Sequence, residues 1–145
     1  MRENVIIEYI GGKEPHYASE EASGADLYAH LEAPCIIKSK ETCVVSTGLK
    51  MAIPHGYEAQ VRPRSGLAFH HGITVLNSPG TIDSDYRGEI KVLLINLGTE
   101  DFTLEPNQRI AQLVIMPTIR AEFKKVNTLS STVRNEGGFG STGKA

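Results

Sequence analysis

Residues 76–91 read LNSPGTIDSDYRGEIK, and this stretch sets the expected character of the fold. Asp83 and Asp85 stand at alternate positions, and alternate residues of an extended chain point to the same side. We therefore expect the two carboxylates to share a face. Ser, Pro and Gly before them and Arg87-Gly88 after them are typical of turns, and an apolar run follows. The pattern predicts a β-hairpin, whose backbone N–H and C=O groups stand at fixed spacing.

Short apolar runs recur along the chain between Gly, Pro, Asn and Asp clusters, and helical periodicity is nearly absent. This pattern is typical of an all-β sandwich or barrel. A helical turn is expected only over residues 65–69, with Ser65 at an N-cap or anion-binding position. Residues 90–95 are apolar on both faces except at Lys91, which predicts cover on both sides by another sheet or a neighbouring subunit. Other strands are expected at residues 5–10, 23–29, 35–37, 42–46, 49–53, 57–62, 73–76, 102–104 and 109–116.

The bulk composition excludes several classes of partner. A chain of 145 residues with net charge -2 and only short runs of like charge has the size of one domain, and we expect no nucleic-acid or membrane partner. The run from Met1 to Glu8 is too short and too charged for a signal peptide, so we expect a cytoplasmic protein. Cys35 and Cys43 lack metal-ligand spacing and are expected to be reduced structural thiols. The histidines show no ligand spacing either and are expected on the surface or in loops: His16, His30, His55, His70 and His71.

Two polar residues in this pattern are chemically informative. Asp83 could orient and partly deprotonate a water molecule from a rigid strand, or it could simply stabilise a turn beside Gly and Ser. Asp85 is expected to be structural and paired with a nearby arginine such as Arg87. Gln112 shares a predicted strand face with Ile110 and Val114, and an amide without partners there would cost about 1 to 3 kcal/mol.

Five stretches resemble, in order, the signature motifs of the trimeric deoxyuridine triphosphate nucleotidohydrolase (dUTPase) family. They cover the chain almost from end to end, and their order makes the resemblance specific. The sequence departs from the family at Asn107-Gln108, where the family usually has a glycine and often an acidic residue. The stretches are SGADLYA (residues 23–29), RPRSGLA (62–68), the centre of residues 76–91 given above, RIAQL (109–113) and RNEGGFGSTG (134–143).

The resemblance implies a distorted jelly roll or β-barrel, with a dUTPase-like domain over residues 1–133. It implies a flexible Gly-rich tail over residues 134–145 that closes over the active site, and a homotrimer whose three sites each collect motifs from all chains. The implied activity is that of a dUTP diphosphatase, in which water attacks the α-phosphorus with Mg²⁺ assistance and dUMP and pyrophosphate are released. This reaction limits uracil incorporation into DNA and supplies dUMP for dTMP synthesis.

The resemblance also assigns roles to individual residues. Asp83 orients the attacking water, Gln112 faces that water or a phosphate, and Arg64 stabilises phosphoryl charge. For Gln112, a buried amide bonded to backbone is the alternative. Tyr86 packs on the deoxyribose and excludes ribonucleotides, and Asp26 supports Mg²⁺ through water. The remaining implied substrate contacts are Ser65 and Gly66 on phosphates, Asn77, Gly80, Thr81 and Lys91 around the base, and Arg134, Phe139, Gly140, Ser141 and Thr142 in the tail.

Three other interpretations compete with this one. Residues 138–143 satisfy G-x-G-x-x-G, but this motif needs a strand before it and a helix after it, and neither can form here. A dCTP deaminase would carry a catalytic glutamate after the hairpin, where this chain has the apolar Val92-Leu93-Leu94. A non-catalytic nucleotide-sensing or protein-interaction module on the same fold is the third. For the tail alone, a disordered terminus without function is the alternative.

Overall fold

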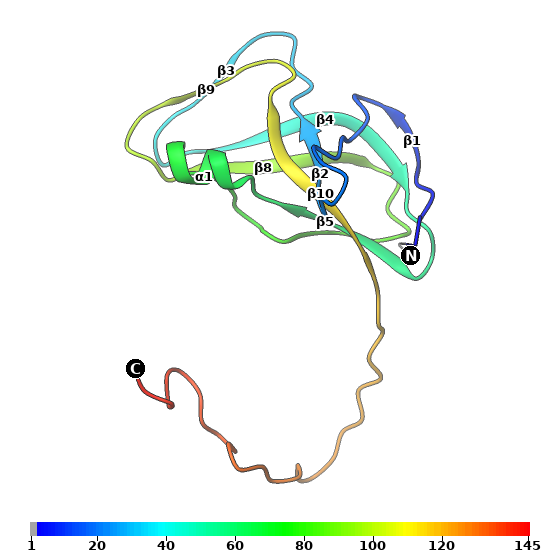
Figure 1. Ribbon diagram of the computed structural model, residues 1–145, viewed down its shortest axis with the longest axis vertical. Helices are drawn as coiled ribbons and strands as arrows, with labels where there is room; N and C mark the ends of the chain where they lie inside the picture. Colours follow the sequence, from blue (N-terminus) through cyan, green and yellow to red (C-terminus); the bar gives the residue numbers. More distant parts are fainter. Residues whose placement is uncertain (1–2) are drawn as a thin grey trace.

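Ten short strands and one short helix make up the computed structural model, which describes residues 3–145 (Figure 1). The predicted all-β fold is confirmed. Met1 and Arg2, with which the predicted domain begins, lie outside the described residues. The strands are β1 (Glu8–Gly11), β2 (Ala25–Tyr28), β3 (Cys35–Ile37), β4 (Thr42–Ala52), β5 (Tyr57–Arg62), β6 (Ile73–Val75), β7 (Gly80–Ile82), β8 (Glu89–Asn96), β9 (Phe102–Leu104) and β10 (Arg109–Pro117), and the helix is α1 (Ser65–His71).

The strands form two four-stranded sheets and a two-stranded one. The first sheet has the order β1-β4-β8-β6, the second has the order β2-β10-β5-β7, and β3 pairs with β9. All of these pairings are antiparallel. Non-consecutive neighbours within each sheet show that the chain crosses repeatedly from one sheet to the other.

The core joins the buried faces of both large sheets. Val45 and Leu94 come from the first sheet and Leu27, Ala59 and Ile110 from the second, and all belong to one apolar cluster. Burying a side chain of the size of Val or Leu contributes about 1.5 to 3 kcal/mol, so this cluster is the main source of stability. In β5 the buried residues alternate as predicted.

Strand β4 replaces two strands that the sequence predicts. Residues 42–46 and 49–53 were expected as two strands, but β4 runs without interruption from Thr42 to Ala52. Its register against β8 shifts between Ser46 and Lys50, where Gly48 adopts a φ of 72°. The irregularity absorbs the glycine without ending the strand: four steps along β4, from Ser46 to Lys50, lie opposite two steps along β8, from Lys91 to Glu89, so β4 carries two extra residues and pairing resumes beyond them.

The predicted hairpin is not a two-stranded ribbon. β7 pairs with β5 in the second sheet, whereas β8 pairs with β4 and β6 in the first. The connection between β7 and β8 therefore passes from one sheet to the other. Within it, the N–H of Tyr86 donates to the carbonyl of Asp83 at 3.1 Å and closes a turn. The extended-chain argument for a face shared by Asp83 and Asp85 does not hold, because Asp85 lies within this turn.

Arg87 also differs from expectation. Its guanidinium Nη1 donates to the carbonyl oxygens of Ser84 at 2.6 Å and Tyr86 at 3.1 Å rather than pairing with Asp85. The arginine thus stabilises the turn through backbone contacts.

Helix α1 is longer than the expected single turn and is capped differently. Its N-cap is Arg64, with extended φ and ψ and no side-chain capping bond, so Ser65 is the first helical residue rather than the cap. Gly72 ends the helix in the left-handed conformation and donates to the carbonyls of Ala68 and Leu67. Among residues 3–145, no helix has the length and apolar character needed to cross a membrane.

β8 is fully covered on one face only. Ile90, Val92 and Leu94 are buried, whereas Leu93 and Ile95 on the other face are half-buried. The prediction of cover on both faces is therefore met in part within one chain.

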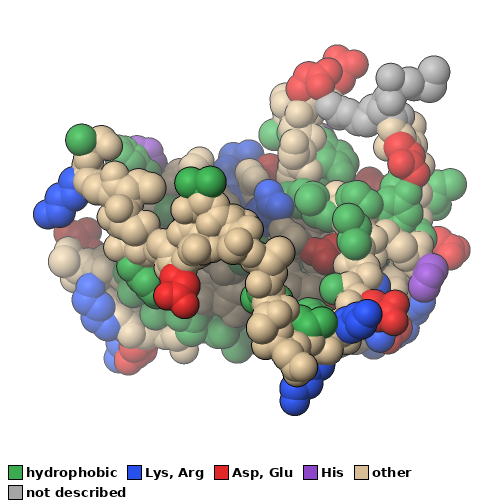
Figure 2. All heavy atoms as spheres, turned by 90° about the horizontal axis from the view of Figure 1, so that it is seen from below, with side chains coloured by type: hydrophobic (Ala, Val, Ile, Leu, Met, Phe, Trp, Pro, Cys, Tyr) green, Lys and Arg blue, Asp and Glu red, His purple; other side chains and the backbone are tan. Residues whose placement is uncertain are grey.

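Beyond β10 the chain leaves the body. The N–H of Thr118 donates to the carbonyl of Gly56, and residues 118–145 then run outward as a long extended segment (Figure 1). Apolar side chains along it are almost fully exposed, with Ile119 at 98%, Phe123 at 96% and Leu129 at 88%. On the face seen in Figure 2, basic side chains are scattered among acidic ones rather than gathered into one patch.

Candidate active site

A cavity of about 380 Å³ opens where the two four-stranded sheets meet around β7 and the start of β8. Its volume lies in the range of small-molecule sites, about 300 to 1,000 Å³. Its lining contains residues from both sheets and from the connection between β7 and β8. Among them are these residues that the sequence predicts for the site: Asn77, Gly80, Thr81, Asp83, Tyr86 and Lys91.

The floor of the cavity is apolar and its rim is polar. Val61, Val75 and Ile90 are buried, and sequence reasoning did not assign them to the site. Their signal is present in the alternating patterns of β5 and β8, but that pattern does not tell a cavity wall from ordinary core. The rim carries Asp83 and Lys91, both exposed. A ligand with a flat ring, apolar on its faces and polar at its edges, fits such a site.

The side of the cavity near Asn77 is shaped by a close approach. A Cβ at Gly80 would lie 3.4 Å from Asn77 Nδ2 and 3.4 Å from the Cβ of Val61. The bare backbone of Gly80 therefore lets the amide of Asn77 and the floor come close together. The N–H of Leu76 donates to the carbonyl of Leu93, which ties the segment before β7 to β8.

Tyr86 also lines the cavity. Its hydroxyl donates to the backbone carbonyl of Glu89 at 2.8 Å, and 46% of the residue remains exposed. One end of the ring is thus held by the first residue of β8, while part of the ring stays available for contact with a ligand.

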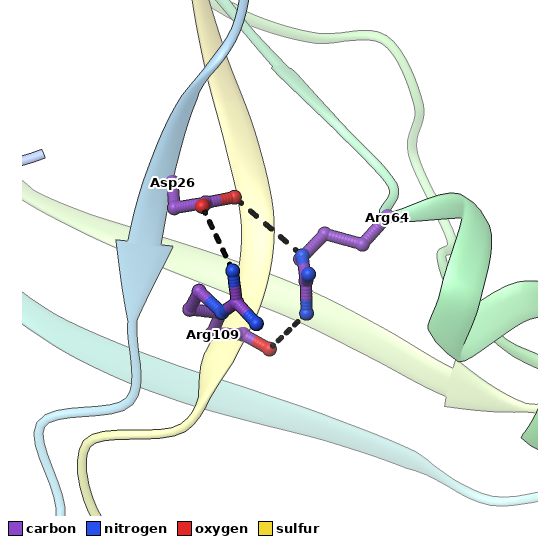
Figure 3. Close-up of polar contacts among 3 residues, drawn as sticks. All are labelled: Asp26, Arg64 and Arg109. Atoms are coloured by element: carbon purple, nitrogen blue, oxygen red, sulfur yellow. Dashed lines mark hydrogen bonds and ion pairs between the residues drawn. The ribbon is translucent and has the colours of Figure 1, made fainter. Parts of the chain in front are cut away.

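A second group of predicted residues lies outside this cavity lining, around Asp26 on β2 (Figure 3). Asp26 is buried, and its Oδ1 lies 3.5 Å from Nε of Arg64 while its Oδ2 lies 3.6 Å from Nη1 of Arg109. Arg64 Nη1 also donates to the carbonyl of Arg109 at 3.4 Å. The Nε of Arg64 is buried without a hydrogen-bond partner, so the ion pair alone compensates it. Sequence reasoning missed Arg109, although it opens one of the five motifs.

Gln112 joins this second group through the sheet. β10 lies between β2 and β5, and Gln112 stands opposite both Asp26 and Arg62. Directly opposed residues of antiparallel strands point to the same face, so these three side chains are neighbours. A register shift between Arg109 and Ala111 breaks the alternation of β10, so the predicted face shared by Gln112 and Ile110 is wrong.

The remaining predicted residues lie apart from both groups. Ser65 and Gly66 begin α1 beside Arg64 and are exposed. Arg134, Phe139, Gly140, Ser141 and Thr142 lie in the segment that leaves the body (Figure 1). There Nε of Arg134 donates to the carbonyl of Gly137 at 2.8 Å, and Phe139 is fully exposed. One chain therefore assembles the cavity but does not bring the tail onto it.

The described part of the chain holds no ready-made cage for a divalent cation. Among residues 3–145, no group of three or more His, Cys, Asp and Glu side chains is arranged to hold a metal ion. The carboxylate of Asp26 is already shared between two guanidinium groups. These residues therefore fit an ion that arrives with its own oxygen ligands better than one bound directly by protein.

The fold matches solved structures of one class of nucleotide hydrolase. A mutant of the Staphylococcus bacteriophage 80alpha dUTPase, solved with dUpNHpp, superposes with a TM-score of 0.86 at 22% identity, covering 96% of this chain and 99% of that one. A mutant dUTPase from phage phi11 of S. aureus, in which the coordination of a structural Mg(II) ion was described, gives 0.75 at 19% identity, covering 85% and 97%. The architecture is therefore that of the all-β dUTPase fold.

Sequence comparison narrows this class to a family. Residues 12–143 match the sequence model of the dUTPase family. The deoxyuridine 5'-triphosphate nucleotidohydrolase of Rickettsia canadensis is 58% identical over 137 residues, covering 94% of this chain and 93% of that protein. The protein of the same name from Chlamydia pneumoniae is 56% identical over 134 residues, covering 92% of each. The chain belongs to the dUTPase family, and the predicted family is confirmed.

Proposed function

We propose that this protein is a dUTP diphosphatase that hydrolyses dUTP to dUMP and pyrophosphate. The observation that carries the proposal is the cavity between the sheets, which gathers Asn77, Tyr86, Asp83 and the backbone around Gly80 and Lys91. The names of its relatives support the same substrate. The reaction would limit uracil incorporation into DNA and supply dUMP for dTMP synthesis, and we place it in the cytoplasm.

In this proposal the cavity reads the base with its amide and backbone. The Asn77 amide and main-chain groups near Gly80, Thr81 and Lys91 hydrogen-bond the edge of uracil. Because β7 is tied to β5 by its ladder, the backbone at Gly80 cannot move away from a larger base. The methyl group of thymine would collide with it. Tyr86 packs against the deoxyribose and leaves no room for a 2′-hydroxyl.

The chemical step is water attack on the α-phosphorus with pyrophosphate as the leaving group. Asp83 accepts a hydrogen bond from the water, orients it in line and takes its proton as the P–O bond forms. Gln112 supports the same water or a phosphate oxygen. Arg64, the hydroxyl of Ser65 and the bare N–H of Gly66 stabilise the charge on the phosphoryl oxygens, together with donors of the tail.

Mg²⁺ would be carried by the triphosphate, in keeping with its preference for phosphate and water ligands. Asp26 would support it only through bound water, because two arginines already compensate that carboxylate. When bound, the ion would neutralise charge on the phosphates of the leaving group.

We also infer a homotrimer with shared sites. Asp83 lies at the cavity, whereas Arg64 and Gln112 lie outside its lining and the tail runs away from it. A site that uses all of them needs contributions from more than one chain. The half-buried face of β8 and the exposed apolar side chains of residues 118–133 are surfaces that such an assembly would cover. Residues 134–145 would then close over a neighbouring site once a triphosphate provides charged contacts.

Release of pyrophosphate from dUTP, dTTP, dCTP and UTP, measured side by side, tests the proposal. We expect rapid release with dUTP and rates lower by about 10² or more with the others. The methyl group of dTTP and the 2′-hydroxyl of UTP are excluded sterically, whereas the amino group and N3 of dCTP do not match the hydrogen-bonding groups that read uracil. Ammonia release from dCTP would instead indicate a deaminase. Absence of turnover with dUTP would favour the alternative interpretation, a non-catalytic nucleotide-binding module.

A further inference from the structure

The ring of Tyr86 lies directly over Gly88. A Cβ built on Gly88 would clash with the Tyr86 hydroxyl and would lie 2.5 Å from Cζ and 2.8 Å from Cε1 of the same ring. Real Cβ atoms do not approach other heavy atoms so closely. Apart from its two chain neighbours, the three atoms nearest to that Cβ all belong to the Tyr86 side chain.

The backbone at this position does not itself require glycine. The glycines with positive φ are found elsewhere, for example Gly48 and Gly72, and Gly88 is not among them. An L-residue could therefore adopt the local conformation of Gly88 without the strain that applies in the left-handed region. The need for glycine arises from the tyrosine ring that packs on it.

Besides its packing on Gly88, the Tyr86 ring is held by a hydrogen bond from its hydroxyl group. Its hydroxyl donates to the carbonyl of Glu89 at 2.8 Å, and the carboxylate of Glu89 accepts a hydrogen bond from Ser46 Oγ at 2.7 Å. Ser46 begins the bulge of β4, and the N–H of Gly48 donates back to Ser46 Oγ at 3.2 Å. The bulge, the start of β8 and the ring thus form one connected arrangement at the wall of the cavity.

We propose that Gly88 is a positioning residue that sets how far the Tyr86 ring projects into the cavity. Gly88 itself does not touch the substrate and acts only through the ring. This inference rests on the proposed function, in which Tyr86 packs against the sugar. A side chain at position 88 lifts the ring, breaks its hydrogen bond to Glu89 and changes the width of the cavity beside C2′ of the sugar. Discrimination between deoxyribose and ribose then weakens.

The experiment is a double-mutant cycle with Gly88→Ala, Tyr86→Ala and the two combined, with dUTP and UTP as substrates. For Gly88→Ala we expect the ratio of kcat/KM for dUTP to that for UTP to fall about tenfold or more, because the displaced ring packs less well on the deoxyribose and no longer excludes the 2′-hydroxyl of UTP. In the Tyr86→Ala background, where the clashing ring is gone, the same change should alter the ratio less than about twofold. Tyr86→Phe loses only the hydrogen bond to Glu89. The loss of the dUTP-to-UTP ratio in this variant should be smaller than in Gly88→Ala but larger than about twofold.

The kinetics would overturn the inference if the ratio were unchanged in Gly88→Ala, or if the loss were equal with and without the Tyr86 ring. If Gly88→Ala alone fails to fold, rescue of folding by Tyr86→Ala supports the contact, and failure of both contradicts it. A wild-type protein without dUTP turnover would contradict the proposed function instead. A crystal structure of Gly88→Ala would then decide the contact by showing the ring displaced or in place.

Discussion

Gly24 and Gln112 pack against each other so closely that a methyl group on Gly24 would lie 2.7 Å from Gln112 Oε1 and 3.0 Å from its Cβ. Gly24 comes just before β2, and Gln112 stands opposite Asp26 on β10. The absence of a side chain at position 24 thus determines where the amide of Gln112 lies. A residue proposed to orient the reacting water depends on a neighbour that has no functional group of its own.

Gly24→Ala should therefore displace the Gln112 amide, because the end of the glutamine side chain can swing away while its Cβ on β10 has to shift only by a few tenths of an ångström. We expect kcat for dUTP to fall about 10 to 100-fold, since a displacement of about 1 Å can cost 10²-fold. Steady-state kinetics measures this. In a Gln112→Ala background, Gly24→Ala should have little further effect, and an equally large loss there would show that Gly24 acts by another route.

Asp26→Asn should destabilise the protein by about 1 to 3 kcal/mol, because a buried carboxylate compensates both Arg64 and Arg109. Urea unfolding gives this value. The matched control is Arg109→Gln, which removes the more exposed partner, at 49% side-chain exposure. It should cost less than about 1 kcal/mol, as exposed ion pairs do. Equal losses of stability in the two variants would contradict the claim that the Asp26 carboxylate compensates both arginines.

Removal of residues 134–145 should leave the unfolding midpoint unchanged, because the last strand ends at Pro117 and the core uses no residue beyond it. We expect kcat/KM for dUTP to fall about 10²-fold or more, since donors to the phosphates are lost. Removal of residues 144–145 alone is the control and should leave turnover unchanged. Wild-type turnover in the shorter chain would exclude the tail from the mechanism.

The two cysteines, expected as reduced thiols, lie side by side with 3.8 Å between Sγ of Cys35 and Sγ of Cys43, and both are free. The pKa of Cys43 is raised above its ordinary value. Desolvation by burial is the largest cause, and the hydrogen bond to Cys35 and the charge of Cys35 raise the pKa further. A higher pKa leaves less thiolate at a given pH, so iodoacetamide should modify Cys43 more slowly than a free thiol at pH 8.

The Cys35→Ala variant tests the cause of that shift. It removes the hydrogen bond and the neighbouring charge but not the burial, so the pKa of Cys43 should fall part of the way and alkylation should accelerate. Mass spectrometry of the modified protein at several pH values follows the change. An unaltered pH profile would assign the whole shift to burial.

Local sequence patterns were sufficient for most strands and insufficient for their pairing. Residues 57–62 form β5 as predicted, because burial with a period of two is visible within a short stretch. The partners of β7 and β8 are set by contacts between distant segments, so the predicted hairpin was wrong although its two arms are strands. The bulges in β4 and β10 were missed for the same reason.

In the candidate site too, residues close in sequence could be predicted and contacts between distant segments could not. The residues around the cavity could be named from the 76–91 stretch, because they are close in sequence. Arg109 was missed because its partner Asp26 lies on β2, and only the antiparallel pairing of β2 with β10 brings them together. The packing of Gly88 under Tyr86 was not visible either, since a glycine in a turn is usually explained by backbone conformation.

Turnover and binding measured together for Asp83→Asn test the central claim, that a single carboxylate beside the cavity activates water for attack on phosphorus. The amide keeps the size of the side chain but cannot take a proton. We predict that Kd for dUpNHpp stays within about threefold of wild type while kcat for dUTP falls about 10² to 10⁴-fold, the usual contribution of a general base. Near-wild-type turnover in this variant would contradict the account.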